Sequence, residues 1–299
     1  MKIFPLNETS GNHFRLPDET HVSRVHLRTA DLDRALTFYQ RVIGLSLVDR
    51  GKSDASLSAT GNAPAILIFT ETPDAVQAPH RVTGLYHFAI RFPTRRDLAH
   101  ALGRITTAGY PIKGASDHGV AESIHVSDPD GNGVELYYDR PRSEWPMRGG
   151  KHQLIIEPLD FDSLLATSRD TFVPVGVPPQ TDIGHLNLHV ADLKEGERFF
   201  HEFLGLEVMA RISDSATFLA AGGYHHHIAV NTWGGKTSAP ANSTGLISYR
   251  LAVANAQTIR EVKERAGLFG YQAVMAGDVL QVGDPNGHLL ELETALARD

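Results

Sequence analysis

The sequence predicts an α+β protein built from four consecutive βαβββ modules. Two observations carry this prediction. The chain of 299 residues contains an internal duplication, and each half shows, twice over, one strand pattern, one helix pattern and three short strand patterns. A repeat has to be recognised first, because each copy then supports the assignment of the other.

The duplication is visible as short identical segments separated by 161 positions, such as ADL at 30–32 and at 191–193. Further along, the turn sequence DPDGNG that begins at Asp128 has its counterpart in DPNGH at Asp284. The repeated unit has roughly 120 residues, which is the size of a domain rather than of a solenoid repeat.

The first module shows how the elements are assigned. Residues 22–29 alternate between apolar and polar side chains, which is typical of a half-buried strand. Asp31 then stands at the position of a helix N-cap, apolar residues follow at helical spacing, and Gly44 ends the helix. Three short strand patterns follow at residues 45–50, 55–60 and 65–70. The other modules repeat this order at residues 85–138, 183–231 and 246–292.

The duplication also predicts a division into two domains. The first covers residues 1–140 with modules 1 and 2, and the second covers residues 182–299 with modules 3 and 4. The segment 141–181 between them contains six prolines and is predicted to be a linker with one short helix around residues 160–168.

Composition limits the classes of partner and of site. The net charge of -7 argues against nucleic acid or an anionic membrane, which would need a basic face. The chain has no cysteine, which excludes disulfides and thiolate ligands and suits a reducing compartment. No apolar run has the length of a signal peptide core or a membrane span, so we expect a cytoplasmic protein. Sixteen histidines make imidazole and carboxylate the groups to examine.

Several segments carry a resemblance to a known family. The sequences ADLDRALTFYQRVIGL, ADLKEGERFFHEFLGL, SDPDGNGVELYYDRP and YHHHIAVNTW resemble the glyoxalase/bleomycin-resistance/extradiol-dioxygenase group, the vicinal-oxygen-chelate superfamily. Within it, nearly the whole chain resembles the catechol-2,3-dioxygenase family of the bacillus type. The resemblance implies that the four modules pair into two cupped mixed sheets. It also implies that metal ligands come from the first and last strands of paired modules.

The modules differ in the ligands that they offer at these strand positions. In module 1, Arg24 stands where module 3 has a histidine, and a guanidinium cannot bind a cation. Module 4 has Ser248 at the corresponding place and keeps one carboxylate, Glu291. Modules 2 and 3 offer His87, Glu135, His185 and the trio His225–His227.

Two pairings of the modules are open at this point. If module 3 pairs with module 4, the metal ligands would be His185, Glu291 and one histidine of the trio. If module 2 pairs with module 3, His87, Glu135 and His185 form the two-histidine, one-carboxylate triad of non-haem Fe(II) oxygenases, with His227 as an additional ligand. We favour the second pairing and expect Fe²⁺, with Mn, Ni and Zn as alternative divalent metals.

Three histidines are candidates for proton transfer, to which imidazole is suited at neutral pH. The resemblance assigns this role to His226, and strand alternation would turn His226 and His227 to opposite sides. The sequence leaves open which of the two faces the cavity. His118 falls near a loop that contacts the substrate in the similar enzymes, although a solvent-exposed turn is an equally good interpretation. His125 stands where the family has a tyrosine, ten residues before Glu135.

The resemblance and the ligand set together predict an extradiol ring-cleaving dioxygenase. Its substrates would be a catechol-type or hydroquinone-type aromatic compound and O₂, and the sequence does not decide between a monomer and a homodimer. Two alternatives stay open. A glyoxalase-like metal-dependent isomerase or lyase would use four ligands with a second carboxylate or amide. A non-catalytic small-molecule-binding protein would use the same fold without a metal.

Overall fold

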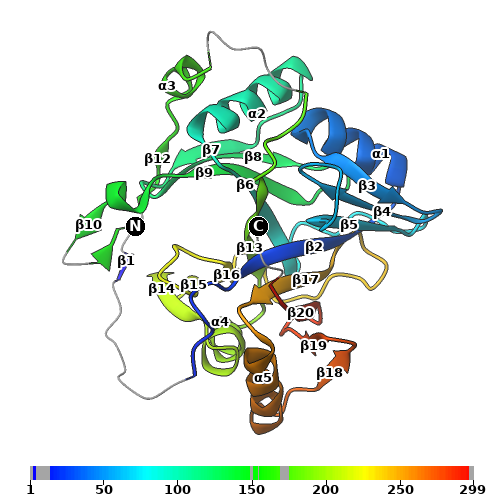
Figure 1. Ribbon diagram of the computed structural model, residues 1–299, viewed down its shortest axis with the longest axis vertical. Coiled ribbons are helices and arrows are strands. Elements are labelled where there is room, and N and C mark those ends of the chain that lie inside the picture. The colour runs from blue at the N-terminus through cyan, green and yellow to red at the C-terminus, as the bar shows by residue number, and fades with distance from the viewer. Residues whose placement is uncertain (1–2, 5–13, 149–150, 154, 169–174, 296–299) are drawn as a thin grey trace.

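The computed structural model describes residues 3–4, 14–148, 151–153, 155–168 and 175–295. Its strands form two large sheets, a ten-stranded sheet A and an eight-stranded sheet B (Figure 1). A separate hairpin in the central segment joins β10 (Met147–Arg148) to β11 (Lys151–His152).

Sheet A joins module 2 to module 3. Module 2 contributes β6 (Gly84–Phe92), β7 (Gly114–Asp117), β8 (Ala121–Ser127) and β9 (Gly133–Asp139). Module 3 contributes β13 (Asp182–His189), β14 (Glu207–Ile212), β15 (Ala216–Ala220) and β16 (Ile228–Asn231). The edge strands are β1 (Ile3–Phe4) and β12 (Glu157–Pro158). The order is β1-β14-β15-β16-β13-β6-β9-β8-β7-β12, so the antiparallel pair of β6 and β13 joins the two modules.

Sheet B joins module 1 to module 4 in the same way. Module 1 contributes β2 (His21–Thr29), β3 (Ser46–Arg50), β4 (Asp54–Ser58) and β5 (Leu67–Glu71). Module 4 contributes β17 (Gly245–Val253), β18 (Ala273–Ala276), β19 (Val279–Gly283) and β20 (Leu289–Thr294). The order is β18-β19-β20-β17-β2-β5-β4-β3, with β2 and β17 antiparallel at the junction.

The sheet order confirms the predicted pairing of module 2 with module 3. The four βαβββ modules are confirmed as well, with strand ends that differ from the predicted ends by a few residues. Each sheet takes one module from either half of the duplication. The predicted domain boundaries, 1–140 and 182–299, follow the duplication along the chain rather than the sheets, and they stay a prediction.

The helices begin and end where the sequence signals predict. Asp31 caps α1 (Leu32–Phe38) by accepting a hydrogen bond from the backbone N–H of Arg34. The helix continues as a wider turn, η1 (Tyr39–Ile43), and ends at Gly44, whose φ of 97° is accessible to glycine at low cost. The other helical segments are α2 (Arg95–Thr107), η2 (Arg142–Glu144), α3 (Phe161–Ala166), α4 (Leu193–Glu197), η3 (Arg198–Phe203) and α5 (Ala256–Phe269).

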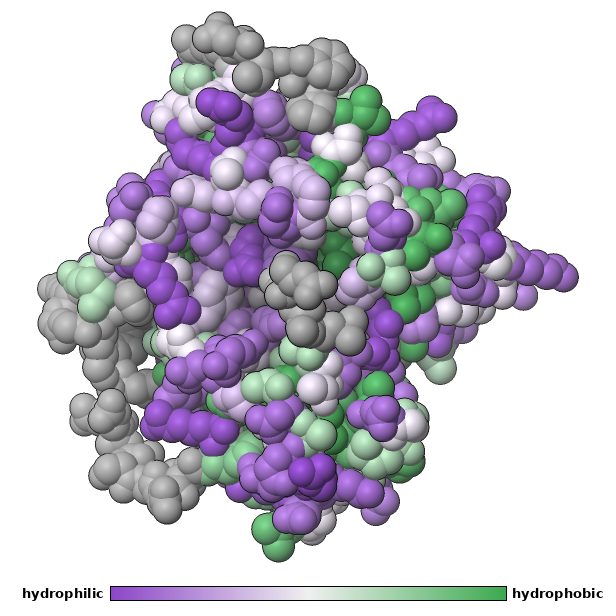
Figure 2. All heavy atoms as spheres, viewed as in Figure 1, coloured by the Kyte–Doolittle hydropathy of each residue, from purple (hydrophilic) through white to green (hydrophobic). Residues whose placement is uncertain are grey.

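One hydrophobic core joins modules from both sheets. The buried ring of Tyr39 in η1 lies 5.0 Å from the ring of Phe69 in sheet B and 6.3 Å from that of Phe88 in sheet A, centroid to centroid. The face of sheet A that carries Phe88 is thereby buried against helices and core. On the outside, Figure 2 shows a face that is mostly hydrophilic, with hydrophobic residues in several smaller areas.

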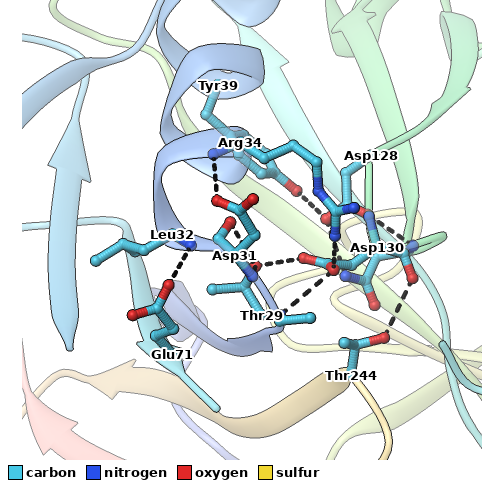
Figure 3. Close-up of polar contacts among 11 residues, drawn as sticks. Thr29, Asp31, Leu32, Arg34, Tyr39, Glu71, Asp128, Asp130 and Thr244 are labelled. Carbon is cyan, nitrogen blue, oxygen red and sulfur yellow. Dashed lines mark hydrogen bonds and ion pairs between the residues drawn. The ribbon is translucent and has the colours of Figure 1, made fainter. Parts of the chain in front are cut away.

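A buried polar contact fixes module 2 against module 1 (Figure 3). Asp128, in the turn between β8 and β9, accepts hydrogen bonds from the Tyr39 hydroxyl at 2.9 Å and from the backbone and side-chain nitrogens of Asn132. Asp130 in the same turn pairs with Arg34 of α1 at 2.7 Å and accepts a hydrogen bond from Thr29. The turn that the sequence marks as DPDGNG is therefore also the point at which α1 docks on sheet A.

Replacing Asp128 with asparagine should change how stability depends on pH. Burial raises the pKa of Asp128 to about 6, although the hydrogen bonds from Asn132 and Tyr39 oppose the shift. The folded protein therefore holds this proton more tightly than the unfolded chain. Protonated Asp128 therefore contributes to the free energy of unfolding. The contribution is full below the unfolded pKa of 3.8 and is lost as the pH rises through the folded pKa of about 6.

Asparagine does not titrate, so the Asp128→Asn variant does not lose this stability as the pH rises. We expect the free energy of unfolding of the variant, relative to wild type, to rise by about 2–3 kcal/mol between pH 4 and pH 7. Urea unfolding of both proteins at a series of pH values measures the difference. A difference that does not change with pH would show that the pKa of Asp128 is not raised in the folded protein.

Candidate metal centre

Two faces of sheet A are distinguished by strand alternation. On β6, Phe88 and Ile90 point into the hydrophobic core, so His87 and Ala89 point to the opposite side. We call this opposite side the site face. On β9 the same alternation buries Val134 and Leu136 in the core and turns Glu135 to the site face.

The register of the strands brings three side chains together on the site face. Ala89 pairs with Glu135 on one side and with His185 on the other, so the carboxylate and the imidazole flank a small residue. His87 lies two residues before Ala89 and therefore on the same face. A methyl group between the two larger side chains leaves room for them to converge.

A bulge in β13 sets the position of His185. The pairing of β13 with β6 shifts between Ile183 and His185, and Gly184 is the extra residue. A Cβ at Gly184 would lie 1.6 Å from the hydroxyl oxygen of Tyr137, so no larger residue fits there. Bulges redirect the side chains that follow them. Because of this bulge, His185 points to the site face, toward Glu135.

The three side chains converge on one oxygen atom. Nε2 of His87 and Nε2 of His185 each lie 3.0 Å from Oε2 of Glu135. All three side chains are buried, with at most 9% of the side chain exposed. The nitrogen of His185 is hydrogen-bonded to the carboxylate, whereas Nε2 of His87 has no hydrogen-bond partner among the described residues.

The spacing and the donor set fit a divalent metal ion. Ligand atoms at adjacent corners around an octahedral ion, each about 2.1 Å from it, lie about 3.0 Å apart. Both nitrogen–oxygen separations have this value. A buried imidazole nitrogen without a partner, such as Nε2 of His87, is costly unless something binds it. Two imidazoles and one carboxylate are the ligands that non-haem Fe(II) sites use.

The ionisation states also suit a metal. Burial by itself would raise the pKa of Glu135, but the neighbouring imidazoles of His125 and His185, together with the hydrogen bond from His185, hold it well below its usual range. Burial lowers the pKa of His185 to about 4, against the opposing effect of Glu135. At neutral pH the carboxylate is ionised and this imidazole is neutral, which are the forms that bind a metal.

His125 lies at the edge of the same cluster. It pairs directly with Glu135 across β8 and β9, and its Nε2 lies 4.0 Å from Oε1 of that residue. Ligand atoms of His87, His125 and Glu135 all lie within 4.8 Å of one another, so His125 is a second candidate for the third ligand beside His185. Its hydrogen bond to Ser123 and its partial exposure, 28% of the side chain, favour a place beside the metal rather than on it.

The structure corrects the placement of the histidine trio. The last strand of module 3 begins at Ile228, so His225–His227 lie in the loop before it and strand alternation does not govern them. His227 stacks on Tyr224 at 4.8 Å and accepts a hydrogen bond from the backbone N–H of Ala221 at 3.2 Å. The structure does not bring His227 into the cluster around Glu135, so nothing here supports it as a ligand.

His226 lies beside the candidate metal centre. Its ring centroid is 4.0 Å from that of His185 and 5.1 Å from that of Phe218 on β15. Burial, together with the neighbouring His185 and His225, holds the pKa of His226 well below its usual range. His226 is therefore neutral at neutral pH.

His118 lies at the end of β7, outside the cluster. Its Nδ1 is 3.3 Å from the carbonyl oxygen of Ile155 in the central segment, and its backbone N–H donates to Ala121. The structure gives no contact between His118 and the three converging side chains. Its predicted role toward the substrate stays a prediction.

Sheet B has charged side chains at the corresponding positions. Glu291 occupies the place of Glu135, and two guanidinium groups hold it, Arg250 at 2.6 Å and Arg24 at 3.4 Å. Positive side chains thus stand where sheet A gathers imidazoles. Among the described residues, the one group of three candidate ligands whose atoms all lie within 4.8 Å of one another is His87, His125 and Glu135, on sheet A.

Comparisons with known proteins identify the family of this chain. The family model described as the Glyoxalase/Bleomycin resistance protein/Dioxygenase superfamily matches residues 20–136. Catechol-2,3-dioxygenase from Bacillus subtilis (strain 168) is 39% identical over 273 residues, which span 90% of this chain and 95% of that protein. The chain belongs to the glyoxalase/bleomycin resistance protein/dioxygenase superfamily.

Other similar proteins are more distant. Biphenyl-2,3-diol 1,2-dioxygenase 3 from Rhodococcus globerulus is 30% identical over 116 residues, 38% of this chain and 60% of that protein. The structure of a proposed dioxygenase from Bacillus subtilis superposes with a TM-score of 0.67 at 13% identity, covering 94% of this chain and 86% of that one. Glyoxalase I from Zea mays gives 0.56 at 17% identity and covers 92% of both chains. These structures show that the fold is shared.

The helices of the described part of the chain were also compared with the requirements of a membrane span. None of them is both long enough and apolar enough to cross a bilayer.

Proposed function

We propose that this chain is an extradiol ring-cleaving dioxygenase that acts on catechol-type or hydroquinone-type aromatic compounds with Fe²⁺ and O₂. The observation that carries the proposal is the convergence of His87, Glu135 and His185 on the site face. This is the two-histidine, one-carboxylate set of non-haem Fe(II) oxygenases. The 39% identity to a catechol-2,3-dioxygenase over nearly the whole chain supports the same conclusion.

In this proposal the three side chains hold the iron on one side and leave the other side to the substrates. Bound Fe²⁺ would supply coordination of the catechol oxygens and of O₂, and would make the catechol hydroxyls more acidic. The buried carboxylate and imidazoles exclude water from the ligand side of the site. Their low exposure keeps their interaction with a cation strong.

His226 is the group proposed to move protons. Its ring lies against that of His185, beside the proposed metal, so it is placed to take up the proton that a catechol hydroxyl loses and to return it later. His125, on the opposite side of Glu135, is a second polar contact for the substrate.

An apolar wall next to His226 suits a flat aromatic ring. Phe218 lies 5.1 Å from His226 and packs with Ile212, Ala216 and Ala229 in a small cluster of its own. Aromatic substrates bury well against such side chains, and two polar oxygens then fix the orientation of the ring.

An oxygen-consumption assay tests the proposed function. Protein purified without O₂ and loaded with Fe²⁺ should consume one O₂ per catechol and form the ring-opened semialdehyde that contains all atoms of both substrates. The hemithioacetal of methylglyoxal and glutathione, offered with Zn²⁺ or Ni²⁺, tests for isomerase activity. Isomerisation without catechol-dependent oxygen uptake would refute the proposal, as would a protein that retains no metal.

A further inference from the structure

A chain of hydrogen bonds leads from His226 away from the metal centre. Nδ1 of His226 lies 2.8 Å from Nδ1 of His225, and Nε2 of His225 lies 2.8 Å from Oδ1 of Asp139. The ring of His225 is 8% exposed. Asp139 comes from the end of β9, four residues after Glu135, so the chain starts on the strand that also carries the proposed carboxylate ligand.

Asp139 is held firmly by further groups. Its Oδ2 accepts a hydrogen bond from the Tyr224 hydroxyl at 2.8 Å, and the hydroxyl of Tyr137 lies 2.6 Å from that of Tyr224. The guanidinium of Arg91 lies 3.4 Å from the same Oδ2 and makes a two-point contact with Asp182. The carboxylate therefore has a fixed direction, with Oδ1 toward His225.

The donors and acceptors of this chain can be assigned by elimination. An ionised carboxylate only accepts, so Nε2 of His225 must carry a hydrogen. At a pH where His225 carries a single hydrogen, its Nδ1 is then an acceptor, and the hydrogen between the two rings belongs to Nδ1 of His226. In neutral His226 this leaves Nε2 with a free lone pair.

We infer that Asp139 and His225 are positioning residues that fix the tautomer of His226, so that its Nε2 is the proton acceptor. The catalytic consequence rests on the role proposed above for His226, whereas the tautomer follows from the contacts of rings that each carry a single hydrogen. A general base with the proton on the wrong nitrogen cannot act until it rearranges. Asp139 and His225 would thus affect turnover without touching the substrate.

The substitution Asp139→Asn tests the inference, because it should reverse the tautomers of both histidines. Arg91 beside the δ2 position favours the amide oxygen there, which turns the amide NH₂ toward His225. Nε2 of His225 must then accept, its Nδ1 must donate, and the hydrogen of His226 must move to Nε2. We expect both rings to reverse their tautomers in an isosteric variant.

Nitrogen NMR of the metal-free protein with ¹⁵N-labelled histidine reads this directly at pH 8, where an ordinary histidine is neutral. The variant His226→Gln identifies the signals of His226. Wild type should show hydrogen on Nδ1 and a lone pair on Nε2, and Asp139→Asn should show the reverse. A wild-type His226 with hydrogen on Nε2 would overturn the inference, and so would an Asp139→Asn variant with an unchanged His226.

Kinetics of the iron-loaded protein test the consequence. In Asp139→Asn and in His225→Phe, kcat for catechol should fall by about 10-fold or more, with KM and iron content little changed. His225→Asn keeps an acceptor near the position of Nδ1 and should recover part of kcat. Equal kcat in all variants would overturn the positioning role. If wild type shows no ring cleavage, the proposed function fails, while the NMR result still decides the tautomer.

Discussion

Replacing His87 with alanine should abolish iron retention and ring cleavage together. Its Nε2 lies 3.0 Å from Glu135 and has no hydrogen-bond partner among the described residues, so the proposed metal is its one evident use. Wild type should hold about one Fe²⁺ per chain and the variant close to none. Metal analysis after purification without O₂, with the oxygen-consumption assay, measures both.

The same variant should stay folded. The hydrophobic core lies on the other face of sheet A, so we expect the free energy of unfolding of the metal-free protein to change by less than about 2 kcal/mol. A matched pair of conservative changes serves as a control. Glu135→Gln should lose iron, whereas Glu291→Gln, at the corresponding position of sheet B, should keep it. Full iron content and activity in His87→Ala would refute the assignment of this residue.

Replacing His226 with glutamine should slow turnover and leave iron binding intact. His226 contacts His185 through its ring but does not belong to the three converging groups. General acid–base groups contribute on the order of 10²–10⁴ in rate, so kcat should fall by about that factor. Steady-state kinetics with catechol and metal analysis of the same preparation measure the two effects separately.

His227→Gln is the comparison for this variant. His227 packs on Tyr224 and accepts a hydrogen bond from Ala221. Its replacement should therefore lower the melting temperature and leave kcat nearly unchanged. If His227→Gln instead lost iron while His226→Gln turned over normally, the roles of the two histidines would be exchanged.

The sequence was sufficient for most of the fold because its signals are local. Asp31 and Asp192 cap their helices, and Gly44 and Gly205 end them with φ of 97° and 86°. The pairing of modules 2 and 3 is not local. It could be predicted because modules 2 and 3 carry most of the candidate ligands, whereas modules 1 and 4 have Arg24 and Ser248 at those positions. The order of the strands in the two sheets confirms the pairing.

The part that sequence analysis missed depends on loop conformation and on distant contacts. The sequence predicts that the trio belongs to a strand, but β16 starts after it. In the loop, the rings of His225 and His226 both pack against the ring of His185. The contact of His225 with Asp139 spans 86 residues, and no spacing rule points to it. The only signal in the sequence is the histidine triplet itself. It indicates where in the chain the site histidines lie, but not which way each ring points.

The role of His125 illustrates the same limit. His125 and Glu135 lie on the same face of the sheet, because β8 and β9 pair the two residues directly. Nε2 of His125 lies 4.0 Å from a carboxylate oxygen of Glu135 and Nε2 of His185 lies 3.0 Å from the other, and sequence spacing does not predict this difference. Both histidines lie near Glu135, so the iron content of variants at His125 and at His185 can be compared to decide which of them binds the metal.

The most direct test of the account is the location of iron by anomalous X-ray scattering from crystals of Fe²⁺-loaded protein grown without O₂. We predict one strong peak on the site face of sheet A, within bonding distance of His87, Glu135 and His185, with His226 beside it but not bound. A peak beside Glu291 in sheet B, or one bound by the histidine trio without His87, would contradict the central claim.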